Sequence, residues 1–182
     1  MYGDIDRWFK REGAVFLRDI GVRPGYLVLD FGCGSGHYTI PAAKVVGESG
    51  QVYALDQNRA VFDKLMEKAA TMDLNNIVVV QSLKELKLYP NADSLDVVLL
   101  YDVLHSHYFT AVERKNLLES IDKVMKVHSL LSLYPKHMGP IEIKVIRDRL
   151  EKLGFYLERE AAVNLIHDGS YDTGNILNFR KE

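Results

Sequence analysis

The sequence predicts an α/β protein built on a doubly wound, mostly parallel β-sheet. Short apolar runs of strand length alternate with segments that carry apolar residues at helical spacing, which is typical of β-α-β units. The strand-length runs are apolar throughout rather than at alternate positions, as expected for strands covered on both faces. Near the C-terminus two strand-like runs follow each other without a helix between them, so we expect one antiparallel strand in the sheet.

The first half of the chain begins with an amphipathic helix over residues 4–20, after which Gly21 suits a left-handed cap. A second helix is expected after a glycine-rich segment, around 38–46, and a third around 61–72. Strands are expected at the apolar runs 27–31, 51–56, 77–81, 96–101 and 129–134.

The second half of the chain carries two further helices. The first follows Thr110, which can form a capping box with Glu113. The second begins near Pro140 and ends at Gly154. Two strands, 155–162 and 175–181, then form a hairpin whose connection is a long polar loop.

Composition excludes several classes of protein. The 182 residues include 23 Lys and Arg and 25 Asp and Glu, so the formal net charge is −2 and nucleic acid is not an expected partner. No apolar run approaches the roughly 18 residues of a membrane span, and the charged N-terminus is unlike a signal peptide. A single cysteine, Cys33, excludes an internal disulfide and predicts a reducing, cytoplasmic environment. We expect one domain over residues 1–182.

The most informative segment is VLDFGCGSGHYTI, where a strand leads through Gly32, Gly34 and Gly36 into a helix. Alternate glycines allow a tight turn and let backbone N–H groups approach a ligand, and the helix N-terminus adds partial positive charge. An ordinary tight turn is the alternative. The dinucleotide fingerprint would need its third glycine at His37, and Asp30 would repel a pyrophosphate. The loop therefore favours a nucleoside that carries an amino acid over NAD.

Asp56 ends the next apolar strand, about twenty residues after the loop. A carboxylate at this strand end can accept two hydrogen bonds from ribose hydroxyls. The alternative is a helix N-cap, for which Asn58 is equally suited. We favour the ribose interpretation.

Together these features resemble the class I S-adenosylmethionine (SAM)-dependent methyltransferases, in particular the small-molecule branch that includes the ubiquinone and menaquinone-biosynthesis C-methyltransferases. The resemblance is sharpest at DFGCGSG, residues 30–36, followed by Asp56, and it extends from residue 21 to the terminal hairpin. It implies a Rossmann-like sheet of seven strands whose last strand is antiparallel, and SAM as the cofactor.

The resemblance also implies residue roles. Asp30 would face the methionine amino group, directly or through water, and Tyr101 would border the methyl-bearing sulfur. An N-terminal lid over residues 1–22, with Tyr2 and Trp8, would cover a cofactor-binding core over 26–135. The helix and hairpin would occupy 139–182. The other implied cofactor-binding residues are Gly32, Cys33, Gly34 and Gly36 in the loop, Asp56 and Gln57 at the ribose and adenine, and Ser82 and Leu83 at the adenine edge.

The sequence departs from the family pattern in three places. Gln81 and Ser82 end the third strand where many relatives have an acidic residue, and residues 125–129 replace a usual glycine pair. Only residues 82–94 separate the third and fourth strands, so we expect the helix there to be reduced.

Histidines follow the fourth strand on the edge of the sheet that binds ligands in α/β folds. With Asp102, His105 and His107 suggest a metal site, but local spacing without a fourth ligand is common by chance and we expect no metal. We expect His105 to act as a general base or to orient the substrate, with Tyr101 as the second catalytic candidate. His137 and Met138 are expected in the same pocket. Two other histidines, His128 and His167, are expected at the surface.

The leading hypothesis is a SAM-dependent methyltransferase that acts on a small molecule. One alternative is a noncatalytic SAM-binding partner domain, and another is a nucleotide-dependent Rossmann oxidoreductase, which the early third glycine disfavours. The sequence does not identify the acceptor. We expect its site to form from the N-terminal helix and the loops after the fourth and fifth strands, and a homo-oligomer or a partner subunit is left open as a contributor.

Overall fold

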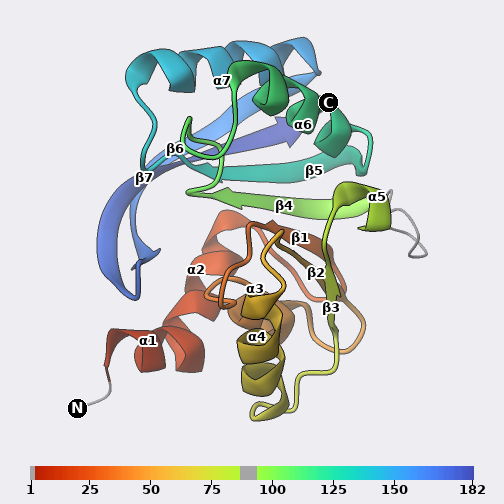
Figure 1. Ribbon diagram of the computed structural model, residues 1–182, viewed down its shortest axis with the longest axis vertical. Coiled ribbons are helices and arrows are strands. Elements are labelled where there is room, and N and C mark those ends of the chain that lie inside the picture. Colours follow the sequence, from red (N-terminus) through yellow and green to blue (C-terminus); the bar gives the residue numbers. More distant parts are fainter. Residues whose placement is uncertain (1–2, 87–93) are drawn as a thin grey trace.

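The computed structural model describes residues 3–86 and 94–182, which form a seven-stranded sheet between two layers of helices (Figure 1). The strand order is β3-β2-β1-β4-β5-β7-β6, and only β7 runs antiparallel to its neighbours. The predicted α/β, mostly parallel sheet is confirmed. The strands are β1 Leu27–Phe31, β2 Gln51–Leu55, β3 Ile77–Val80, β4 Leu95–Tyr101, β5 Met125–Tyr134, β6 Phe155–His167 and β7 Ser170–Lys181.

Helices cover both faces of the sheet, as its apolar strands require. One core contains apolar side chains of the N-terminal helices, α3 and α4, and the other contains those of α6 and α7. Figure 1 shows α2, α3 and α4 below β4 and the pair α6 and α7 above it. The described helices are α1 Asp4–Arg7, η1 Trp8–Glu12, α2 Gly13–Ile20, α3 Thr39–Val46, α4 Ala60–Ala70, α5 Leu83–Leu86, α6 Ala111–Asp122 and α7 Pro140–Lys152.

The N-terminal helical segment differs from the single α-helix that the sequence predicts, because its middle part, η1, is π-helical. Trp8 is only 1% exposed there, and its indole Nε1 donates a hydrogen bond to the His37 carbonyl at 2.7 Å. A Cβ on Gly13 would meet the Trp8 ring at 2.8 Å, so the absence of a side chain allows this close packing. The segment is thereby fixed against the start of α3.

The C-terminal hairpin corrects the predicted long polar loop. β6 and β7 pair as far as His167 and Ser170, with one register shift between Leu157 and Arg159, and leave a two-residue turn at Asp168 and Gly169. Both turn residues have positive φ, 47° and 80°, as in the type I′ turns that suit hairpins. The polar residues after the turn are strand residues of an extended hairpin arm, where exposure permits polar side chains.

Local signals at the helix ends behave as expected. Thr110 and Glu113 form the predicted capping box at the start of α6. Pro140 begins α7, and Gly154 follows it with a φ of 84°. The described part of the connection between β3 and β4 holds only the four-residue helix α5, while its remainder, 87–93, lies outside the described residues.

No helix in the described part of the chain is long and apolar enough to cross a lipid bilayer.

Candidate functional site

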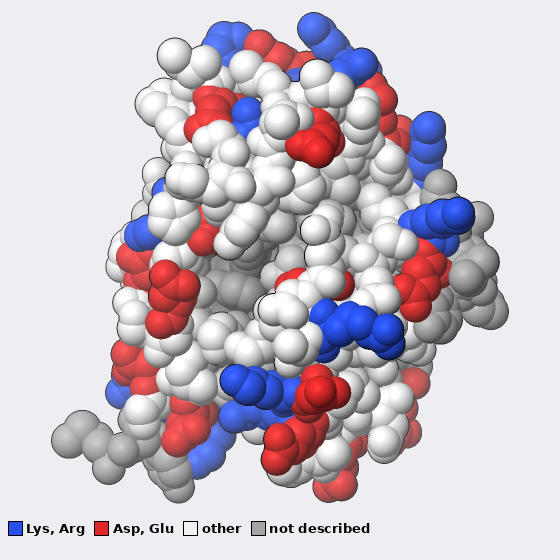
Figure 2. All heavy atoms as spheres, viewed as in Figure 1, with Lys and Arg blue, Asp and Glu red and all other residues white. Residues whose placement is uncertain are grey.

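A cavity of about 570 Å³ opens at the carboxyl ends of the parallel strands. It is lined by the turn after β1, the residues after β2 and β4, the end of β5 and the tip of the β6-β7 hairpin. Figure 2 shows this face hollowed near its centre, with mostly uncharged atoms around the hollow. Its volume lies within the range of small-molecule sites, and its position is where open α/β sheets bind ligands.

The glycine loop forms one wall of the cavity. Backbone N–H groups of Gly32 and Cys33 both donate to the Leu55 carbonyl, at 2.8 and 3.0 Å, which fixes the turn to the end of β2. Gly32 and Gly34 have φ values of 78° and 50°, and both line the cavity together with Cys33. Space around Gly34 is open, since an added Cβ would meet nothing within 4 Å. The loop therefore offers backbone surface that a ligand can approach closely.

Gly36 is placed differently from the other two glycines. It does not line the cavity, and a Cβ at this position would lie 2.3 Å from Leu65 Cδ1 of α4. With a φ of 86°, Gly36 allows close packing of the turn against that helix. Gly36 therefore contributes to packing rather than to the surface of the cavity.

Asp56 lies beside the loop and faces the cavity with Gln57. Its Oδ2 accepts from the Gly34 N–H at 3.0 Å and its Oδ1 accepts from the Asn58 N–H at 2.8 Å. The alternative interpretation of Asp56 as a helix cap is wrong, because α4 begins after Arg59 and Asn58 is the residue whose side chain accepts from Ala60. The carboxylate thus holds the loop and still lies at the cavity wall.

Asp30 lies behind the loop rather than at its surface. Its carboxylate is buried and accepts a 2.5 Å hydrogen bond from Thr39 Oγ1. Burial raises the pKa of Asp30 to about 6, against the opposing effect of the Thr39 hydrogen bond. A cationic ligand group nearby would favour the ionised form.

Two residues that the resemblance implies at the adenine edge are not brought to the cavity. Ser82 Oγ accepts from the Glu85 N–H at 3.1 Å and so caps the short helix α5. Leu83 packs, half-buried, against the hydrophobic core on the α6 and α7 side of the sheet. With only four residues in α5, the segment after β3 is taken up by its own capping and packing.

Tyrosine rings form the floor of the cavity. Tyr101 lines it, and its hydroxyl lies 2.8 Å from Ser132 Oγ, which in turn donates to Asn178 Oδ1 at 2.7 Å. The Tyr38 ring meets the Tyr101 ring edge-on, with centroids 4.5 Å apart. Burial raises the pKa of Tyr101, so its hydroxyl is neutral and the ring presents an uncharged aromatic surface. Sequence reasoning placed Tyr38 on a helix but did not predict it at the site.

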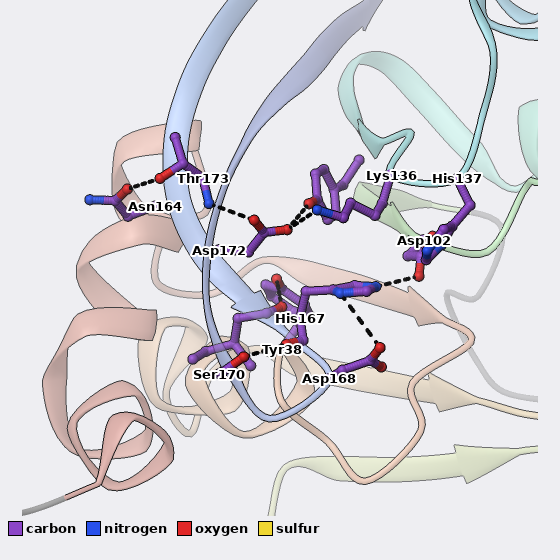
Figure 3. Close-up of polar contacts among 12 residues, drawn as sticks. Tyr38, Asp102, Lys136, His137, Asn164, His167, Asp168, Ser170, Asp172 and Thr173 are labelled. Carbon is purple, nitrogen blue, oxygen red and sulfur yellow. Dashed lines mark hydrogen bonds and ion pairs between the residues drawn. The ribbon is translucent and has the colours of Figure 1, made fainter.

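Asp102 connects the cavity to a group of histidines (Figure 3). It directly follows β4, lines the cavity and has a φ of 52°, a conformation that few non-glycine residues adopt. His167 Nε2 lies 2.7 Å from its Oδ2, and His137 Nδ1 lies 2.7 Å from its Oδ1. The imidazole of His105 is further away, with Nε2 3.9 Å from Oδ1.

The histidine positions correct three sequence expectations. His167 is not a surface residue: its side chain is 15% exposed and lines the cavity. His105 and His137 do not line it, since they lie around the other carboxylate oxygen of Asp102. Burial lowers the pKa of His105. The turn that brings His167 to the cavity is the Asp-Gly pair, a recognisable hairpin signal that the sequence contains.

Two further expectations concern residues nearby. Met138 packs against the core on the α6 and α7 side rather than in the cavity. His128 is exposed, as predicted.

The cavity wall is acidic. Asp56, Asp102 and Asp168 line it, and no lysine or arginine of the described residues does so. Fixed charge of one sign in a partly enclosed site favours a ligand of the opposite sign. The arrangement therefore suits a cationic ligand.

The tip of the β6-β7 hairpin lines the cavity, whereas the N-terminal segment predicted as a lid does not. Ile166, His167 and Asp168 line the cavity, whereas no described residue of α1, η1 or α2 does. The Tyr38 hydroxyl donates to the Ile166 carbonyl at 2.6 Å and holds the tip in place. The N-terminal segment instead packs beneath α3, because Trp8 is buried there; Tyr2 lies outside the described residues.

A family profile described as a methyltransferase domain matches residues 28–128, more than half of the chain. The chain belongs to the methyltransferase domain family. The matched region includes the glycine loop, Asp56, Asp102 and His105. The resemblance to class I SAM-dependent methyltransferases is thereby confirmed.

Curated relatives match a short part of this methyltransferase domain. A protein of Thermoplasma acidophilum named probable cobalt-precorrin-6B C(15)-methyltransferase (decarboxylating) is 38% identical over 64 residues, 35% of this chain and 32% of that protein. A demethylmenaquinone methyltransferase of Staphylococcus aureus is 38% identical over 66 residues, 36% of this chain and 26% of that protein. The chain thus matches about a third or less of the length of these relatives.

Solved structures confirm the fold over nearly the whole chain. A SAM-dependent methyltransferase from Aquifex aeolicus superposes with a TM-score of 0.72 and 24% identity, covering 97% of this chain and 93% of that one. The magnesium protoporphyrin IX methyltransferase of Synechocystis, solved with bound SAM, gives a TM-score of 0.67 and 23% identity over 93% and 76% of the chains. The predicted Rossmann-like sheet with one antiparallel strand is the fold of these methyltransferases.

Proposed function

We propose that this chain transfers the methyl group of SAM to a small-molecule acceptor. The single observation that carries the proposal is the acidic cavity lined by the glycine loop and Asp56, at the carboxyl ends of β1 and β2 in a methyltransferase fold. SAM carries a sulfonium and an ammonium group, and an acidic wall without lysine or arginine among its described residues fits both cations.

In this proposal the residues at the carboxyl ends of β1 and β2 hold the cofactor. Asp56 accepts hydrogen bonds from the ribose hydroxyls, and Gln57 lies beside the adenine. The backbone of Gly32, Cys33 and Gly34 contacts the methionine and ribose part. Asp30 acts from behind the loop, directly or through water, on the ammonium group. Gly36, Ser82 and Leu83 were also expected here, but their packing and capping contacts support structural roles instead.

The bound cofactor supplies an electrophilic methyl group, and the remaining task of the protein is alignment. Tyr101 and Tyr38 present neutral rings at the floor of the cavity, where aromatic surface attracts a cation. Holding two reactants in line can supply roughly 7–11 kcal/mol of barrier reduction. We therefore assign Tyr101 to positioning beside the sulfonium.

His167 is better placed than His105 to accept a proton from an acceptor. It lines the cavity and is oriented by Asp102 at 2.7 Å, whereas His105 is buried behind that carboxylate. An imidazole that a carboxylate orients is a common general base. Acceptors that must lose a proton, such as hydroxyl or amine groups, would depend on it.

A small acceptor is favoured by the printed names of two curated relatives, a probable cobalt-precorrin-6B methyltransferase and a demethylmenaquinone methyltransferase, and by the near-neutral net charge. We propose that residues 1–182 work as one domain, with 26–135 as the cofactor-binding core and 139–182 as the helix and hairpin.

The single buried cysteine supports a reducing, cytoplasmic environment.

Calorimetric titration with S-adenosylhomocysteine tests the cofactor assignment. We expect binding of S-adenosylhomocysteine and none of NAD; the reverse result would favour the oxidoreductase alternative. Transfer of a labelled methyl group from SAM to a pool of metabolites then separates an enzyme from a noncatalytic SAM-binding partner domain. Binding without any transfer would support the partner domain.

A further inference from the structure

A second group of ligand-forming side chains lies behind the cavity wall, around Oδ1 of Asp102, the carboxylate oxygen that does not contact His167. Asp102, His105 and His137 each offer one ligand atom, and the three atoms lie within 4.8 Å of one another. Asp102 and His105 lie in the segment after β4, and His137 lies in the segment after β5. We propose that Asp102, His105 and His137 form a binding site for a divalent transition-metal ion, for which Zn²⁺ is the best-suited member.

The distances suit a shared ion. His105 Nε2 lies 3.9 Å from Asp102 Oδ1, too far for a hydrogen bond, and His137 Nδ1 lies 2.7 Å from the same oxygen. Ligand atoms about 2.1 Å from a tetrahedral ion are separated by about 3.4 Å, between these two values. All three ligand atoms lie within 4.8 Å of one another, so side-chain adjustments on the order of 1 Å would place them around one ion.

The types of ligand select the class of metal. Two imidazoles and one carboxylate suit Zn²⁺, Co²⁺, Ni²⁺ or Fe²⁺, whereas Mg²⁺ and Ca²⁺ prefer oxygen ligands. The contacts of His105 with His107 leave the other ring nitrogen, Nε2, facing the site: the His107 backbone N–H donates to His105 Nδ1 at 3.3 Å, and His107 Nδ1 lies 3.1 Å from the same atom. The His137 side chain is 44% exposed, which gives an ion and a further ligand from solution access to the site.

The proposed site also connects to the cavity. Asp102 Oδ2 is bonded to His167 of the hairpin tip, so an ion on Oδ1 would fix the carboxylate that orients His167 (Figure 3). One ion would thereby link the segments after β4 and β5 to the wall of the cavity. The positive φ of Asp102, a strained conformation retained where surrounding contacts determine it, places the carboxylate between the two groups.

Sequence spacing alone did not reveal this site. Asp102 and His105 are three residues apart, but the third ligand is 35 positions after Asp102 and comes close because β4 and β5 are parallel neighbours. Both strands end at the same edge of the sheet. The expectation of no metal rested on the local cluster of Asp102 with His105 and His107, which does not include His137.

Metal binding can be tested without any enzyme assay. After chelation and dialysis, the full chain is titrated with Co²⁺ and its visible absorption is recorded, and Zn²⁺ content is measured after reloading. We expect one equivalent of either ion and a d–d spectrum of four- or five-coordinate Co²⁺. The exposed ligand is replaced in His137→Ala, whose fold is checked by circular dichroism, and we expect its metal affinity to fall at least 100-fold.

The matched control is His128→Asn, which changes an exposed histidine of β5, outside the proposed site, to a residue that tolerates its φ of 64°. It should bind metal as the unchanged chain does. Absence of a stoichiometric Co²⁺ complex, or equal affinity in His137→Ala, would overturn the proposal. Titration with S-adenosylhomocysteine in the same samples keeps the two proposals apart, because cofactor binding does not require the ion.

Discussion

The cavity has one wall at the ends of β1 and β2 and another at the ends of β4, β5 and the hairpin tip. The first wall contains the backbone of the glycine loop, which is held by hydrogen bonds between Gly32, Cys33 and Leu55 and by Asp56. The second wall consists of side chains, among them Tyr101, Asp102 and His167. A backbone wall suits one constant ligand, whereas a side-chain wall can vary with the acceptor while the fold stays the same.

The largest expected effect is on the second wall. If the acceptor must lose a proton, His167→Ala removes the oriented base, and we expect the turnover number to fall about 10²- to 10⁴-fold. S-adenosylhomocysteine affinity should stay within about twofold, since the first wall is unchanged. Steady-state kinetics and calorimetry on the same preparation measure both. A large loss of cofactor affinity with normal turnover would contradict the division between the walls.

The second prediction concerns Asp56. Asp56→Ala removes the proposed acceptor for two ribose hydroxyls, and at about 1.5–3 kcal/mol for each charge-assisted bond we expect S-adenosylhomocysteine affinity to fall 100-fold or more. Asp63→Ala, an exposed change in α4, is the control and should leave affinity unchanged. Equal affinity in both variants would refute the ribose role.

The third prediction is a pH dependence of cofactor binding. Asp30 has a raised pKa of about 6, and a nearby ammonium group would favour its ionised form. Below pH 6 the ligand-free protein holds a proton that binding must release, so S-adenosylhomocysteine affinity should fall up to about tenfold per pH unit. Titrations between pH 5 and 7.5 test this. Asp30→Asn should remove the dependence, and an unchanged profile would contradict the role of Asp30.

The raised pKa of Asp30 also predicts how the free energy of unfolding depends on pH. Its pKa is raised above the ordinary 3.8, so the ligand-free folded state binds more protons than the unfolded state between about pH 4 and 6. The Asp30 contribution to the free energy of unfolding should therefore fall as pH rises through that window and remain constant above it. Chemical denaturation of the unchanged chain and of Asp30→Asn isolates this contribution; a rising difference would contradict it.

The smallest expected effect is at the hairpin tip. Gly169 has a φ of 80°, and Gly169→Ala should lower the free energy of unfolding by about 1 kcal/mol through backbone strain. Space is not the cause, because an added Cβ would meet nothing within 4 Å. Ser170→Ala, just outside the turn, should have little effect in denaturant unfolding. Equal effects of both changes would show that turn geometry is not the source.

Sequence reasoning was most successful where a signal is local. The glycine loop is predicted from seven consecutive residues, and the Thr110 and Glu113 capping box from four. The antiparallel C-terminal hairpin is predicted correctly, but its connection is not: the polar residues after Asp168 and Gly169 are predicted as a loop, although the two-residue turn itself is a local signal. For the N-terminal segment the amphipathic pattern predicts a helix but not its packing against α3, because amphipathicity does not specify where a helix packs.

By itself the sequence determined the α/β class, the turn after β1 and the carboxylate at the end of β2. These depend on hydrophobic period and on backbone conformations that neighbouring residues set. Only the tertiary structure decided that His167 and His137 meet Asp102, over 65 and 35 positions of sequence. Their meeting depends on strand order and on the length and bend of the hairpin, which result from packing of the whole sheet rather than from residues near each histidine.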